Sequence, residues 1–266
     1  MSSQNVSPNL NQLFSNAHAE GILSAASLQA LNVVDIGAQI QAGLGVHVDD
    51  VSASEVLLVT MMPDDSGSIR FGSNAQAVRD GHNLVLEALG ASKQKDGVLA
   101  HTRYLNGHVL FPYAPLTSAV RLDTHNYNPD QGTPLYDQTV VLLATVLAKA
   151  QEFAENGVPA RTVTLLITDG ADEHSTSAKA THVKALVDDL LRQESHIVAA
   201  MGISDGRTDF KKVFRSMGIR DEWIITPGNT ASEIRRAFQV FSQSAVKAGA
   251  GARGFSKLAL GGFSVN

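Results

Sequence analysis

The chain of 266 residues contains no cysteine, so a disulfide framework and a thiolate metal site are both excluded. No apolar run approaches the roughly 20 residues that a membrane-spanning helix needs, so we expect no membrane contact. Residues 1–8 have neither a basic nor an apolar segment of the kind found in secretory signals, which predicts a cytoplasmic location. The net charge of −5 is small and argues against nucleic-acid binding.

Several catalytic signatures are also missing from the sequence. The phosphate-binding pattern G-x-x-x-x-G-K-[ST] does not occur, and Ser66 lacks the G-x-S-x-G setting of a serine hydrolase. None of the nine histidines shows H-x-x-x-H or H-E-x-x-H spacing, so we interpret His82, His101 and His196 as structural. We therefore expect a protein that is not an enzyme and has no small-molecule substrate.

The sequence does contain enough apolar residues, 44%, to bury a large core. From Glu55 onward, apolar runs typical of buried strands alternate with segments of helical periodicity. Strands are expected near 56–62, 97–105, 108–113, 161–168, 196–203 and 223–226, with helices from about 73 and over 135–154, 183–191 and 210–217, and a last helix opened by Thr230. The alternation predicts an α/β fold with a doubly wound, mostly parallel sheet, one antiparallel edge strand in a hairpin at Asn106-Gly107, and helices on both faces.

Composition divides the chain into three parts. Residues 1–50 predict a helical N-terminal extension, 51–246 the main α/β domain, and 247–266 a Gly- and Ala-rich basic tail. In that tail, Leu258, Leu260 and Phe263 are the expected anchors. The polar stretch 116–131 predicts a long loop, and such loops are usually functional or mobile.

Three separated segments supply oxygen atoms suited to a hard divalent cation. They are Asp64-Asp65-Ser66-Gly67-Ser68, the segment 132–137 with Thr133, and Thr168-Asp169-Gly170. The first and third directly follow expected strands, and loops at the carboxyl ends of parallel strands are where such folds bind ligands. Three hydroxyls beside two carboxylates match Mg²⁺, which keeps several waters and takes few carboxylates. As a simpler alternative, Asp64 and Asp169 would only cap the turns or helices that follow them.

These motifs resemble the metal-ion-dependent adhesion site (MIDAS) of von Willebrand factor type A (vWA) domains, and the resemblance covers roughly residues 54–246. It implies a Rossmann-like fold in which hydroxyls hold Mg²⁺ or Mn²⁺ directly or through water. Two aspartates, mostly without touching the ion, orient these hydroxyls and waters. Carried over to this sequence, the hydroxyl ligands are Ser66, Ser68 and Thr133, and the aspartates are Asp64 and Asp169. Similar bacterial intracellular proteins accompany kinases, phosphatases, AAA+ ATPases or stress-resistance proteins.

Neutral hydroxyl ligands leave the ion electrophilic, so a Glu or Asp of a protein partner can complete its shell. The resemblance therefore implies an adaptor that binds an acidic residue of a protein through the ion. Two other functions stay open: a Mg²⁺-dependent phosphohydrolase with Asp64 as nucleophile, and a ribonucleoprotein-associated module, which would need a basic surface. Pro63 predicts that the strand ends or bends before the first motif, and Asp65, Asp172 and Glu173 are expected to be solvated.

Overall fold

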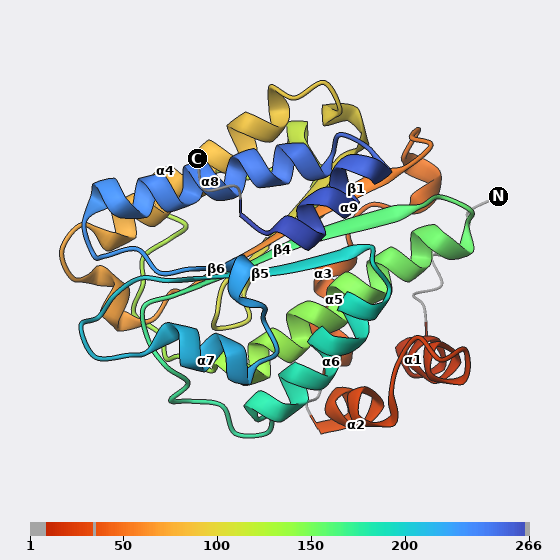
Figure 1. Ribbon diagram of the computed structural model, residues 1–266, viewed down its shortest axis with the longest axis horizontal. Coiled ribbons are helices and arrows are strands. Elements are labelled where there is room, and N and C mark those ends of the chain that lie inside the picture. The colour runs from red at the N-terminus through yellow and green to blue at the C-terminus, as the bar shows by residue number, and fades with distance from the viewer. Residues whose placement is uncertain (1–8, 34–35, 264–266) are drawn as a thin grey trace.

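The computed structural model describes residues 9–33 and 36–263. Its strands are β1 (Val56–Pro63), β2 (Val98–Arg103), β3 (Val109–Pro115), β4 (Ala160–Thr168), β5 (His196–Gly202) and β6 (Ile224–Ile225). They form one sheet in the order β3-β2-β1-β4-β5-β6 (Figure 1). Every neighbouring pair is parallel except β2–β3, a hairpin with Asn106-Gly107 at its turn. The predicted doubly wound sheet with one antiparallel edge strand is therefore confirmed.

Helices cover both faces of this sheet, with α4 and α8 on one face and α5 and α6 on the other (Figure 1). The helices that follow β1 are α4 (Asn74–Gly90), α5 (Leu135–Glu155), α6 (Ala180–Arg192), α7 (Phe210–Ser216), α8 (Ala231–Ala248) and α9 (Ala252–Gly261). Short 3₁₀ helices are η1 (Val48–Asp50), η2 (Gly67–Arg70), η3 (Lys95–Gly97), η4 (Leu116–Ser118) and η5 (Asp221–Trp223). Within the described ranges no helix is long and apolar enough to cross a membrane.

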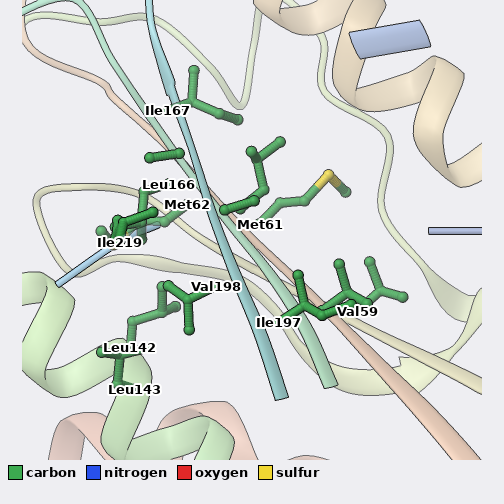
Figure 2. Packing of buried hydrophobic residues seen from close by; sticks show 14 of the residues in the cluster. Val59, Met61, Met62, Leu142, Leu143, Leu166, Ile167, Ile197, Val198 and Ile219 are labelled. Atoms are coloured by element: carbon green, nitrogen blue, oxygen red, sulfur yellow. The ribbon is translucent and has the colours of Figure 1, made fainter. Parts of the chain in front are cut away.

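The core lies between the sheet and its helices. All eight residues of β1 are buried, as expected for a central parallel strand that is covered on both faces. Helix α5 is buried on nearly its whole circumference, in agreement with its all-round apolar sequence. Figure 2 shows Leu142 and Leu143 of α5 beside Val198 of β5, near Met62 and Leu166 of the central strands.

Helices α4 and α8 make the most extensive contact between two elements outside the sheet. Gly81 of α4 faces Phe238 of α8, and a Cβ at Gly81 would lie 2.0 Å from the Phe238 ring. Only a residue without a side chain permits this close approach of the two helices.

The N-terminal residues share the main core. Helices α1 (Leu10–Ala19), α2 (Ala25–Val33) and α3 (Gly37–Leu44) contribute buried apolar side chains to it. The Asp189 carboxylate of α6 accepts a hydrogen bond of 2.6 Å from the Ser24 amide. The Val46 amide donates to the carbonyl oxygen of Tyr113 at 2.9 Å, and α3 contacts β3, so this segment lies against the edge strand. An exposed sheet edge invites aggregation, and this edge is covered.

The C-terminal tail forms α9 and packs against α8. Phe255 and Leu258 are buried, and the Phe263 ring stands edge-on to Trp223 at a centroid distance of 4.9 Å. Leu260 is 80% exposed, so its expected role as an anchor is wrong. The helical period explains the error, because Leu260 lies two residues after Leu258 and therefore on another face of α9.

Candidate metal centre

The three predicted loops meet at the carboxyl ends of β1 and β4. Strand β1 ends at Pro63, as its proline predicted, and the next amide, of Asp64, donates to the carbonyl oxygen of Ile167 at 2.9 Å. This bond sets the first motif directly beside the third, which begins at the last residue of β4, Thr168. After Asp64, the first motif continues into η2, which contains Ser68.

A chain of hydrogen bonds joins four of the predicted residues. The Ser66 and Ser68 hydroxyls are 2.9 Å apart, and the Ser68 hydroxyl donates to Asp169 Oδ1 at 2.6 Å. Asp64 Oδ1 accepts the Ser66 amide at 2.7 Å, and Oδ2 accepts the Thr168 hydroxyl at 2.6 Å. Asp64 thus stabilises its own turn, as the simpler alternative proposed, whereas Asp169 binds a hydroxyl of another loop.

Thr133 is held at this end of the sheet by its backbone. Gln131 pairs with Ser66 in an isolated parallel bridge, and its carbonyl oxygen accepts the Gly67 amide at 3.0 Å. The Thr133 amide donates to His174 Nδ1 at 2.9 Å, and its carbonyl oxygen accepts the amide of Glu173 at 3.2 Å. Thr133 is therefore tied to both other loops, although no hydrogen bond in the described part of the chain joins its hydroxyl to the four side chains above.

Asp137, the last residue of the second motif, connects the start of α5 to the loop after β4. Its carboxylate accepts the amides of Thr176 at 2.8 Å, Ser177 at 3.2 Å and Ala178 at 2.5 Å. The neighbouring Tyr136 amide donates to Asp172 Oδ1 at 3.1 Å. These bonds hold the second and third motifs in one arrangement.

The long loop before the second motif is also fixed in place. The Tyr127 hydroxyl, fully buried, donates to the carbonyl oxygen of Asp64. The carbonyl oxygen of Asp65 accepts the amides of Asp130 at 2.9 Å and Gln131 at 3.0 Å, and its carboxylate accepts the Asn106 amide at 3.0 Å. Asp65 is only 5% exposed, so the expectation that it is solvated is wrong. The amide that binds it comes from the β2–β3 turn, about 40 residues away in sequence.

The centre concentrates buried carboxyl groups. Burial raises the pKa of the Asp64 carboxyl, and the Asp65 pKa rises to about 7 through burial and, to a smaller degree, the charge of Asp64. Burial and the neighbouring charge of Asp64 and Asp205 raise the pKa of Asp169 to about 6. In the described ranges no lysine or arginine forms an ion pair with Asp64, Asp65 or Asp169. The protein thus supplies carboxyl oxygen atoms here without a compensating cation, and the raised pKa values mean that burial opposes the ionisation of these carboxyls.

This donor set fits a hard divalent cation that retains water. Among the residues that the structure describes, no three His, Cys, Asp or Glu side chains are grouped closely enough to form a metal cage. A zinc-type or calcium-type cage is therefore not built here, whereas hydroxyls backed by carboxylates suit Mg²⁺, which binds through few protein ligands. The residues that would hold it are Ser66, Ser68 and Thr133, with Asp64 and Asp169 behind them.

Three residues organise the centre through contacts that the sequence did not indicate. Thr168 and Tyr127 each donate to Asp64, and His174 accepts the Thr133 amide. A signal existed for Thr168, which directly precedes Asp169 in the third motif. None existed for Tyr127, whose place depends on how the whole 116–131 loop folds back.

Comparisons with known proteins support the fold. No family model matches the sequence, and no curated protein matches it. The pilus adhesin SpaC of Lactobacillus rhamnosus GG, in its open conformation, aligns with a TM-score of 0.52 at 14% identity, over 74% of this chain and 30% of the adhesin. A second crystal structure of SpaC gives the same TM-score, 0.52, at 12% identity. The vWA domain of SpRpn10 aligns at a TM-score of 0.48 and 9% identity, over 68% of this chain and 93% of that domain.

The SpaC alignment covers less than a third of the adhesin, and at such low identity it concerns the fold alone. Together with the observed strand order and the antiparallel edge strand, it establishes a vWA-like α/β fold for this chain. The arrangement inferred from the resemblance is thus confirmed at the level of the fold.

Proposed function

We propose that this chain is a protein-binding module that recognises an acidic residue of its partner through a Mg²⁺ or Mn²⁺ ion. The observation that carries the proposal is the hydrogen-bonded series Ser66–Ser68–Asp169 at the carboxyl ends of β1 and β4, among carboxylates without a counter-ion. The vWA-like fold supports the same class of function. When bound, the ion would supply an electrophilic position for a carboxylate.

The chain's own residues divide the work. Ser66, Ser68 and Thr133 would hold the ion directly or through water. Asp64 has both carboxylate oxygens engaged, by the Ser66 amide and the Thr168 hydroxyl, and so orients the first loop. Asp169 orients the Ser68 hydroxyl by accepting a hydrogen bond from it, with an oxygen–oxygen distance of 2.6 Å. Such supporting hydrogen bonds fix the direction of the ligand atoms and raise their affinity for metal.

The same geometry supports a binding role over a catalytic one. A phosphohydrolase that used Asp64 as its nucleophile would need an accessible, free carboxylate oxygen. Asp64 is 0% exposed and both of its oxygens accept hydrogen bonds. We therefore propose that the protein is not an enzyme, and an assay of phosphoester hydrolysis with wild type and Asp64→Asn tests this directly.

The partner test is a pull-down from lysate of the source cell, with Mg²⁺ and with EDTA. Thr133→Ala and Asp169→Ala are compared with wild type and with two matched controls, Thr117→Ala and Asp188→Ala, which change exposed residues. A protein retained only by wild type and the controls, and only with Mg²⁺, supports the proposal. Partners that are retained equally with EDTA and by both centre variants contradict the proposal. The cytoplasmic location stays a prediction, which fractionation of the source cells tests.

A further inference from the structure

The loop that carries the serines ends in two exposed residues, Arg70 and Phe71. The Phe71 amide donates to the carbonyl oxygen of Ser68 at 3.0 Å, which closes a turn. In such a turn the first and fourth Cα atoms lie within about 7 Å of each other, so Phe71 is close to the candidate metal centre. Ile69, between Ser68 and Phe71 in this turn, is 0% exposed and anchors the turn in the core.

Phe71 is the more unusual of the two residues. Its exposed fraction is 76%, and among the described residues only Val120 and Leu260 are also large, apolar and exposed. A single exposed apolar side chain is ordinary on a protein surface. Phe71 differs because it stands on a fixed turn next to the centre, and because aromatic residues and arginine are the types enriched in protein–protein interfaces.

Arg70 adds a free positive charge at the same place. A Cβ at Gly67 would lie 3.6 Å from Arg70 Nη2, so the guanidinium folds back over the segment between the two serines. In the part of the chain that the structure describes, Arg70 forms neither an ion pair nor a hydrogen bond through its side chain. Its donors are therefore available to a carboxylate, which a guanidinium binds in bidentate geometry.

Negative charge near the centre explains what Arg70 would contribute to partner binding. Exposed Asp130 and Asp205 lie close enough to influence Asp65 and Asp169 electrostatically. These carboxylates would repel an acidic partner. A cation on the rim offsets that repulsion and favours a carboxylate over an uncharged side chain.

We infer that Arg70 and Phe71 form a second contact for the partner, whose carboxylate also binds Arg70 and whose neighbouring apolar side chain covers the Phe71 ring. The inference rests on the proposed function and makes it specific. The partner is a protein segment in which an exposed Glu or Asp has an apolar neighbour. An acidic residue in a wholly polar segment binds less well.

Defined peptides test this inference. Three blocked peptides, Gly-Leu-Glu-Leu-Gly, Gly-Ser-Glu-Ser-Gly and Gly-Leu-Gln-Leu-Gly, are titrated into the Mg²⁺-loaded full chain and followed by NMR chemical shifts. Wild type should bind the Leu-Glu-Leu peptide about fivefold tighter than the Ser-Glu-Ser peptide, the gain from partly burying one Leu side chain. Phe71→Ala should abolish this ratio, whereas Phe71→Trp should keep it.

Arg70→Ala should weaken both Glu peptides about tenfold and leave the Gln peptide unchanged, with Arg70→Lys in between. The controls, Leu260→Ala and Arg253→Ala, remove an exposed Leu and an exposed Arg of α9 and should behave as wild type. Thermal melts accompany each variant, since exposed substitutions should leave stability almost unchanged.

The outcomes separate the two proposals. Mn²⁺ binding, measured independently by electron paramagnetic resonance, reports on the centre itself. If Mn²⁺ binds but wild type does not distinguish the two Glu peptides, or Phe71→Ala keeps the preference, the inference about Arg70 and Phe71 is overturned and the metal centre stands. If neither Mn²⁺ nor any peptide binds, both proposals fail.

Discussion

Replacing Asp137 by Ala should damage both stability and metal binding, because this one carboxylate joins the second and third motifs. It accepts three backbone amides, of Thr176, Ser177 and Ala178, and only Ala178 among them is fully buried. A hydrogen bond to a charged group contributes about 1.5–3 kcal/mol, and water can replace the two that lie nearer the surface. We therefore expect a loss of about 3 kcal/mol in the free energy of unfolding.

Urea denaturation measures this change. With a slope of about 3 kcal/mol/M for a chain of this size, the midpoint should fall by about 1 M. Asp137→Asn keeps one acceptor oxygen and should lose roughly half as much. Mn²⁺ affinity should fall about tenfold in Asp137→Ala, since Thr133 loses its support. Asp123→Ala is the control, because Asp123 also accepts two loop amides but is exposed. Equal midpoints for wild type and Asp137→Ala would refute the reasoning.

Three further changes test packing and charge. Gly81→Ala places a carbon 2.0 Å from the Phe238 ring. It should lower the free energy of unfolding, measured in urea, by about 1–3 kcal/mol. Gly90→Ala is the control and should not destabilise the protein, because no atom lies within 4 Å of its new Cβ. Burial lowers the pKa of His196 from 6.5 to about 4. The stability that depends on its neutral imidazole is therefore complete above pH 6.5 and falls by on the order of 3 kcal/mol as the pH drops toward 4. His196→Gln should flatten this part of the profile of urea stability against pH. Deletion of residues 1–50 uncovers the core and the edge of β3, so the shortened chain should melt earlier and aggregate in thermal scans, and an unchanged melting temperature would contradict the account.

Local signals explain why most of the fold was predictable. The apolar run 56–62 is typical of a buried strand, Asn106-Gly107 closes a hairpin, and Thr230 caps α8 by accepting the Glu233 amide at 3.3 Å. Each of these features is decided by a few neighbouring residues, so their sequence suffices.

What escaped prediction depends on contacts between distant residues. Asp65 looked solvated because nothing near it in sequence indicates that the Asn106 amide binds it. The tail was ambiguous since its docking rests on Phe263 meeting Trp223. At the candidate centre, the spacing identified Ser66, Ser68 and Asp169 as neighbours, which the hydrogen bonds confirm, but the metal itself stays a prediction.

The most direct test of the central proposal is a Mn²⁺ titration of the metal-free protein, with the free ion counted by electron paramagnetic resonance. We predict one saturable ion per chain, displaced by Mg²⁺, with affinity reduced at least about tenfold in Ser68→Ala and Asp169→Ala and unchanged in Asp188→Ala. No saturable binding by wild type, or equal affinity in all four proteins, would contradict the account.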